Sequence, residues 1–178
     1  FRAVRMNLNG SMRLETRAEQ RTSYNVIGVL AGTQRPDETI MYSAHWDHLG
    51  RCPAIDGDDI CNGALDNATG VSALIELARR FHAAGRPQRT VAFVALTAEE
   101  QGLLGALYYS QHPVFPARNT VAAINMDGIG NAGRTHDVEI VGIGKSEMDD
   151  LFTQAVQAQG RRVTPDSSPE AGYFYRSD

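Results

Sequence analysis

Short, nearly continuous apolar runs alternate along the chain with segments in which apolar residues recur at helical spacing. The apolar runs cover residues 25–30, 39–43, 90–96 and 121–124, and residues 137–141 form a fifth. Runs of this length are typical of strands that are covered on both faces. Strands that alternate with helices predict an α/β fold, here a three-layer α/β/α sandwich with a mixed, mostly parallel central sheet.

Three segments carry apolar residues at the 3.6-residue spacing of a helix. They cover residues 68–85, 103–112 and 146–160, and each ends at or just before a glycine or a proline. Proline cannot continue a helix and glycine readily ends one, so these residues mark the expected helix ends. The stretch 161–172 contains proline and serine and predicts a loop.

Residues 3–20 alternate apolar and polar side chains around Asn9-Gly10, which predicts an edge β-hairpin at residues 1–20. A chain of 178 residues can bury a substantial core, so we expect a single domain over residues 1–178. No apolar run approaches the ~18 residues of a membrane span. The net charge of −4 comes without a basic block. These features argue against a nucleic-acid partner and against binding to an anionic membrane surface.

The two cysteines, Cys52 and Cys61, lie in one loop rich in glycine and aspartate. They could close a small disulfide loop, which would favour a periplasmic or secreted protein. They could instead both be reduced, or take part in a metal site. The start of the chain carries no signal-peptide pattern, and we expect the sequence to be an excised piece of a longer protein.

Each of three apolar runs is followed at once by side chains that can bind a metal ion. His45 and Asp47 follow the second run, Glu99 and Glu100 the next, and Asp127 the one after. Because parallel strands deliver the residues that follow them to one edge of the sheet, these groups can converge. In an extended chain, residues two apart point the same way, so the Asp47 carboxylate can orient the His45 ring.

Simpler explanations exist for each of these groups. His45 and Asp47 could be a surface pair, and Asp66 or Asn67 could serve only as the N-cap of the helix that follows. Residues 97–100 match a capping box, in which Glu100 would take the third helical position. The joint pattern favours a metal site, because crowded carboxylates repel one another unless cations neutralise them.

A mixture of carboxylate and imidazole ligands suits zinc, with manganese or cobalt as substitutes. The remaining histidines have no matching spacing, and we expect them to be solvated or to have structural partners. They are His48, His82, His112 and His136.

Four segments together resemble the zinc aminopeptidases of the M28 peptidase family. They are residues 43–50, 62–70, 96–105 and 125–127, in that order. The resemblance extends from about residue 24 to the C-terminus. It implies a zinc-exopeptidase-like fold that is incomplete at the C-terminus.

The resemblance also implies two zinc ions in the intact parent protein. His45 and Asp127 would hold one ion, Glu100 would hold the second, and Asp66 would bridge them. A cis peptide bond would follow Asp66.

Two further residues take roles from the same resemblance. Asp47 would orient His45, and Glu99 would be the general base for a water activated by the two metals. The family has one more ligand, a histidine that often follows a Ser-Asp pair, and the chain ends at Ser177-Asp178. We therefore expect an incomplete second zinc site and impaired activity in this fragment.

The first functional hypothesis is a zinc-dependent aminopeptidase, a metallo-exopeptidase that hydrolyses N-terminal residues from peptides. A glutaminyl-cyclase-like transferase on the same fold is the second. A non-catalytic receptor or binding domain that kept the scaffold is the third. The sequence assigns no oligomeric state.

Overall fold

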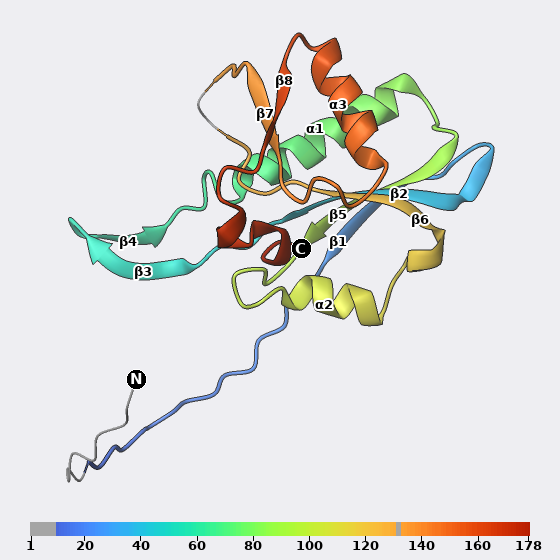
Figure 1. Ribbon diagram of the computed structural model, residues 1–178. Helices are drawn as coiled ribbons and strands as arrows, with labels where there is room; N and C mark the ends of the chain where they lie inside the picture. Colours follow the sequence, from blue (N-terminus) through green and yellow to red (C-terminus); the bar gives the residue numbers. More distant parts are fainter. Residues whose placement is uncertain (1–9, 131–132) are drawn as a thin grey trace, which may run out of the picture.

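The computed structural model describes residues 10–130 and 133–178 (Figure 1). Its central sheet has four strands in the order β1-β5-β2-β6. These strands are β1 (Val26–Leu30), β5 (Arg89–Leu96), β2 (Arg35–His45) and β6 (Thr120–Asn125). β2 runs parallel to β5 and to β6, whereas β1 is antiparallel to β5. The predicted mixed, mostly parallel sheet is confirmed, and its four strands match the first four apolar runs.

The register of the parallel strands fixes where the site can form. His45, the last residue of β2, pairs with Leu96, the last residue of β5. On the other side of β2, Ser43 pairs with Asn125, the last residue of β6. The segments that follow these three strands therefore leave the sheet at the same edge.

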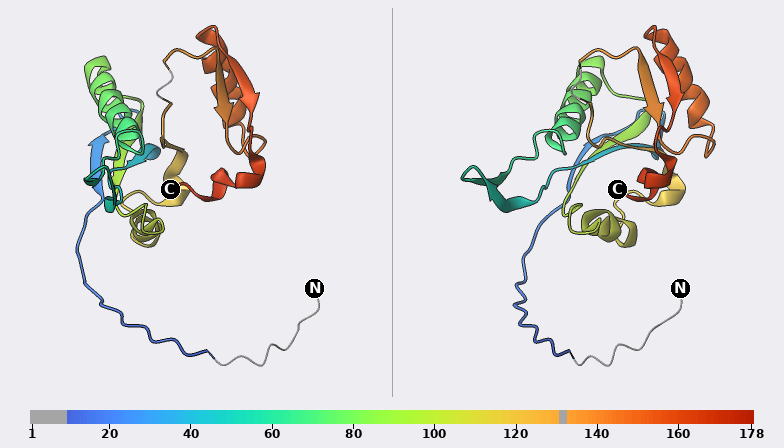
Figure 2. Two further views of the ribbon diagram at one scale, coloured as in Figure 1. Left: turned by 90° about the vertical axis from the view of Figure 1, so that its left-hand side faces the viewer. Right: turned by 60° about the vertical axis from the view of Figure 1, so that its left-hand side comes forward.

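One helix covers each face of the central sheet (Figure 2). α1 (Ala68–Ala84) buries Leu74 against Val91 and Phe93 of β5. The alternate β5 residues point to the opposite face, where α2 (Leu104–Gln111) packs beside them. This alternation follows from the two-residue period of a strand, and it builds the expected three layers.

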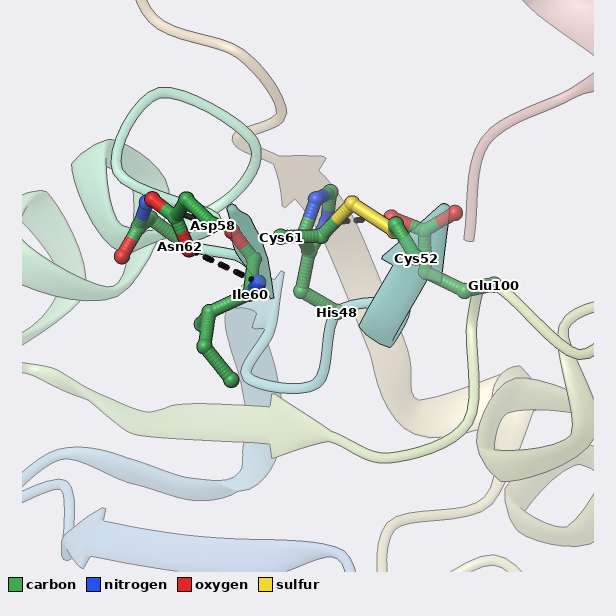
Figure 3. The surroundings of a disulfide bond; sticks show 7 residues. All are labelled: His48, Cys52, Asp58, Ile60, Cys61, Asn62 and Glu100. Carbon is green, nitrogen blue, oxygen red and sulfur yellow. Dashed lines mark hydrogen bonds and ion pairs between the residues drawn. A yellow bond between two sulfur atoms is a disulfide. The ribbon is translucent and has the colours of Figure 1, made fainter. Parts of the chain in front are cut away.

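A short hairpin projects from the end of β2 and carries both cysteines. It consists of β3 (Gly50–Ile55) and β4 (Asp58–Cys61), joined by an Asp56-Gly57 turn with positive φ at both residues. Asp-Gly favours this kind of two-residue turn. Cys52 and Cys61 form a disulfide across the hairpin, with their Cα atoms 5.9 Å apart (Figure 3). Of the three alternatives for the cysteines, the structure has the disulfide.

Residues 137–165 form a small separate layer. β7 (Asp137–Ile140) pairs in parallel with β8 (Arg162–Pro165), and α3 (Met148–Ala158) connects them. The prediction of a strand near residues 137–141 is confirmed, but its placement among the internal strands is wrong, because β7 pairs with β8 outside the central sheet. The prediction of a loop throughout 161–172 is also wrong. β8 is too short and too poor in apolar residues to be recognised as a strand.

Three short 3₁₀ helices complete the secondary structure of the described residues. They are η1 (Ala117–Asn119), η2 (Pro169–Ala171) and η3 (Tyr173–Tyr175). No helix among the described residues is long and apolar enough to cross a bilayer.

The predicted N-terminal hairpin is wrong over its described half. Residues 10–25 contain no strand, and Met12 and Leu14 are 83% and 73% exposed. Residues 1–9, which would form the other half, lie outside the described residues. A two-stranded ribbon is stable only when it packs against other elements, and this segment does not bury its apolar side chains.

We expect Leu74→Ala to lower the free energy of unfolding by ~2–5 kcal/mol, because it leaves a cavity under α1. Leu74 is 5% exposed, whereas its neighbour Ile75 is 64% exposed. Ile75→Ala is therefore a matched control and should change stability by less than ~1 kcal/mol. Urea unfolding followed by circular dichroism measures both variants. Equal losses would mean that α1 does not pack on the sheet through the face that carries Leu74.

Candidate metal centre

The residues that follow β5 and β6, together with the residue that precedes the N-cap of α1 and the C-terminal segment, line one cavity of about 920 Å³. Five carboxylates line it: Asp66, Glu99, Glu100, Asp127 and Asp178. Arg176 is the cationic side chain in the same wall. The cavity is therefore strongly acidic.

His45 lies next to two of these carboxylates. Its side chain is fully buried, and its Nε2 lies 3.1 Å from Asp66 Oδ1 and 3.3 Å from Asp127 Oδ1. Its Nδ1 lies 3.1 Å from the backbone oxygen of Asp47. If Nδ1 carries the proton and donates to this oxygen, Nε2 is left free to face the two carboxylates.

The Asp47 carboxylate, which is predicted to orient His45, lies near the ring but makes its closer contacts elsewhere. Its Oδ1 lies 3.8 Å from His45 Nδ1, and the backbone oxygen makes the closer contact. The carboxylate instead accepts hydrogen bonds from the backbone N–H groups of Glu99, at 3.1 Å, and Glu100, at 3.3 Å. Asp47 thus ties the end of β2 to the turn that follows β5.

The N-cap explanation holds at the start of α1, but the capping-box explanation does not hold at the start of α2. Asn67 is the N-cap of α1 and accepts a hydrogen bond from the backbone N–H of Gly70. The preceding Asp66 is left to face His45, and the Asp66-Asn67 peptide bond is cis, as the resemblance implies. The capping-box explanation of residues 97–100 is wrong, because α2 begins only at Leu104. Glu99 and Glu100 lie in a turn ahead of the helix.

Sequence reasoning missed His48. Its Nδ1 lies 2.6 Å from Glu100 Oε1, and together with Asp66 these two residues form a second group whose ligand atoms all lie within 4.8 Å of one another. The first such group is His45, Asp66 and Asp127. His48 is three residues from His45, in the loop that follows β2, and that closeness was the available signal.

The other histidines have no part in this centre. His112 stacks on Tyr108, with ring centroids 4.4 Å apart, and its Nδ1 contacts the Tyr108 backbone oxygen. His82 lies exposed in the last turn of α1, and His136 lies exposed just before β7.

The electrostatics of the cavity show how strongly the acids affect one another. Burial raises the pKa of Glu99, and the carboxylates of Asp178 and Asp127 raise it further, although His45 opposes them. Burial also raises the pKa of Asp178, to about 6. For His45, burial lowers the pKa, but the charges of Asp127 and Glu99 outweigh it and the net shift is upward.

The donor set fits a divalent cation such as zinc. Among the described residues, several buried atoms of the site make no hydrogen bond of acceptable geometry. They are His48 Nδ1, Glu100 Oε1 and the two carboxylate oxygens of Asp178. Buried polar atoms without partners are costly, and a bound cation would satisfy them. Imidazole nitrogen and carboxylate oxygen are ligands that zinc prefers.

Comparison with known proteins agrees with this geometry. The sequence profile of peptidase family M28 matches residues 25–178. A probable zinc metalloprotease of Pyrenophora teres f. teres (strain 0-1) is 39% identical over 107 residues, which cover 60% of this chain and 23% of that protein. The chain thus spans about a quarter of the length of this relative.

Two further proteins are similar over part of their length. Aminopeptidase NAALADL1 of Mus musculus is 31% identical over 120 residues, covering 64% of this chain and 15% of that protein. The crystal structure of BSAP, a zinc aminopeptidase from Bacillus subtilis, superposes with a TM-score of 0.61 at 24% identity. The superposition covers 79% of this chain and 34% of the aminopeptidase chain. At this sequence identity the likeness shows a shared fold.

We expect Asp47→Asn to destabilise the protein by ~1–3 kcal/mol, because an amide cannot accept hydrogen bonds from two backbone N–H groups on both of its terminal atoms. Faster hydrogen exchange at the amides of Glu99 and Glu100 would locate the effect. Asp37→Asn, at an exposed position, is the control and should leave both measurements unchanged. Unchanged exchange in Asp47→Asn would refute the anchoring role of this carboxylate.

We expect zinc to raise the melting temperature of metal-free protein. A ligand that binds only the folded state at a hundredfold excess over Kd adds ~2.7 kcal/mol of stability. Asp127→Asn should reduce the gain, because it removes a carboxylate that faces His45 Nε2. The control Asp37→Asn should keep the full gain. A melting temperature that does not respond to zinc would exclude the metal centre.

Proposed function

The chain belongs to peptidase family M28, and from this we propose that it forms the metal-binding part of a zinc-dependent aminopeptidase. The protein would hydrolyse N-terminal residues from peptides. The observation that carries this proposal is the convergence of Asp66, Glu99, Glu100 and Asp127 on one cavity, with the buried His45 Nε2 beside two of them. The relatives named zinc metalloprotease and aminopeptidase support it.

The chain would hold the metal through the groups around Asp66. His45 and Asp127 would bind on one side of Asp66, and Glu100 on the other. Zinc bound there would act as a Lewis acid toward the scissile carbonyl and would make water more acidic. The buried position of His45 and its bond to the Asp47 backbone would fix the direction of its free nitrogen.

Glu99 is the residue that we propose as the general base. It lines the cavity, and burial, followed by the neighbouring carboxylates, raises its pKa above that of an ordinary glutamate. A base with a raised pKa takes up a proton more readily, which suits it to accept the proton of the attacking water. It would then pass this proton to the leaving amine.

The acidity of the cavity supports cleavage at the end of a peptide. A free N-terminus carries a positive charge at neutral pH, and the Asp178 carboxylate, which lines the cavity without a proposed metal role, would attract it. An internal peptide bond offers no such charge. We therefore favour an aminopeptidase over an endopeptidase.

The disulfide supports a proposed location outside the cytoplasm. Cys52 and Cys61 are bonded to each other, and such bonds persist in the periplasm and outside the cell. We propose a periplasmic or secreted protein. Peptides are its proposed substrates.

We expect Glu99→Gln in the full-length protein to lower kcat by ~10²–10⁴-fold, because glutamine keeps the shape of the side chain but cannot accept the proton. Zinc content should stay the same. Release of the N-terminal residue from a short peptide, followed by mass spectrometry, measures the rate. Glu147→Gln, at an exposed position near α3, is the control and should keep the rate of the wild type.

A peptide with N-terminal glutamine distinguishes the transferase alternative. Hydrolysis removes the whole residue, whereas cyclisation removes only ammonia, and the two products differ in mass. Loss of ammonia alone would replace the aminopeptidase with a cyclase. Zinc binding without conversion of any peptide in a panel of N-terminal residues would favour a binding domain.

A further inference from the structure

We propose that a basic cavity beside the β7–β8 layer is a binding site for a phosphate group. The cavity has a volume of about 560 Å³ and is lined by two short segments of the chain. Residues 133–136 come directly before β7, and residues 159–161 come directly before β8. The proposal does not use the metal centre and goes beyond the aminopeptidase function.

The basic cavity lies at the other end of β7 from the acidic cavity. Figure 1 shows β7 and β8 side by side, and the two strands run parallel. The residues that line the basic cavity precede the starts of both strands. The acidic cavity is lined instead by Val141, which follows β7 directly. The two cavities share no lining residue, so they are separate sites.

The side chains that line the basic cavity are cationic or neutral. Arg134 and Arg161 contribute guanidinium groups, and His136 contributes an imidazole. No carboxylate is among the described residues that line it. The arginines that form ion pairs in the described part of the chain are other ones. Two guanidinium groups at one cavity without an acidic partner attract an anion.

Arg161 is held in place on one side of its guanidinium. Its Nη2 donates to the backbone oxygen of Asp137, at 2.8 Å, and to Oγ1 of Thr135. Its Nε is buried and has no hydrogen-bond partner among the described residues. A buried donor without a partner costs free energy, and an oxygen of a bound anion would satisfy it. The guanidinium is therefore both fixed in position and incompletely bonded.

A structural role for Arg161 accounts for only part of this arrangement. Arg161 follows the C-terminus of α3, where a positive charge is favourable. The terminal carbonyl groups of α3 would repel an anion, but those of Val156 and Gln157 already accept backbone hydrogen bonds from the turn that follows. Arg134 and His136 are exposed and come from the other segment, so the helix end does not explain them.

The arrangement of the donors suits a phosphate better than a carboxylate. Arginine binds phosphate oxygens through several N–H groups at once, and an imidazole can donate one further hydrogen bond. A phosphate group carries more negative charge than a carboxylate at neutral pH, so it gains more from two arginines. A cavity of about 560 Å³ has room for a small phosphate ester as well as for inorganic phosphate.

Hydrogen–deuterium exchange of the full-length protein, with and without inorganic phosphate at constant ionic strength, tests the proposal. We expect phosphate to slow exchange at the amides of residues 133–136 and 159–161, because a bound anion links the two segments. Calorimetry gives the affinity. Arg134→Gln should weaken it at least ~10-fold, because the variant lacks a charge-assisted hydrogen bond. Arg118→Gln, at an exposed position in η1, is the matched control and should keep the affinity of the wild type.

Four results would overturn the proposal. Unchanged exchange at both segments would refute the site. An equal loss of affinity in Arg118→Gln would mean that net charge alone attracts phosphate. Acetate that binds as tightly as phosphate would make the ligand a carboxylate. Exchange that slows only around Glu99 and Asp127 would move phosphate to the proposed metal centre and leave the basic cavity without a ligand.

Glycerol phosphate distinguishes the two sources of the phosphate group. If it binds at least as tightly as inorganic phosphate, and Arg134→Gln weakens both, the site accepts a phosphate ester. If inorganic phosphate alone binds, the ligand is the free anion. Arg134 is exposed, so its replacement should not prevent folding, and thermal unfolding of both variants checks this.

Discussion

Repulsion between carboxylates gathered around one buried imidazole is the constraint on which the site depends. Asp66 and Asp127 both approach His45 Nε2, and after burial the charges of Asp178 and Asp127 raise the pKa of Glu99 further. Such a cluster persists only if rigid backbone holds it and if positive charge offsets it. The central sheet provides the first condition, because β2, β5 and β6 end in register. A divalent cation would provide the second.

The central sheet could be predicted from the sequence because its strands are buried on both faces, which leaves a continuous apolar run in each. β7 has a weaker pattern and its partner could not be predicted, since four residues do not specify a pairing. β8, with its single apolar valine, gave no pattern at all. The alternation of apolar and polar side chains predicted the N-terminal hairpin. Such a segment forms a stable strand only when its apolar face packs against another element.

The candidate site was predicted more completely than its internal contacts. Side chains directly after parallel strands must converge, so His45, Asp127 and the glutamate pair followed from the strand ends. His48 did not, because it contacts Glu100 and packs close to Gly63, and both residues lie far from it in sequence. The contacts of the Asp47 carboxylate could not be predicted either, since they go to backbone N–H groups that any residue carries.

The single carboxylate of Asp47 holds two consecutive amides, and this has a mechanical consequence. Glu99 and Glu100, a proposed base and a proposed ligand, share one anchor, so a displacement of the turn moves both together. The distance between Glu99 and Glu100 then changes little when the turn moves. The two side chains therefore need little rearrangement when a proton is transferred. A substitution at position 47 would therefore displace the proposed base and the proposed ligand together.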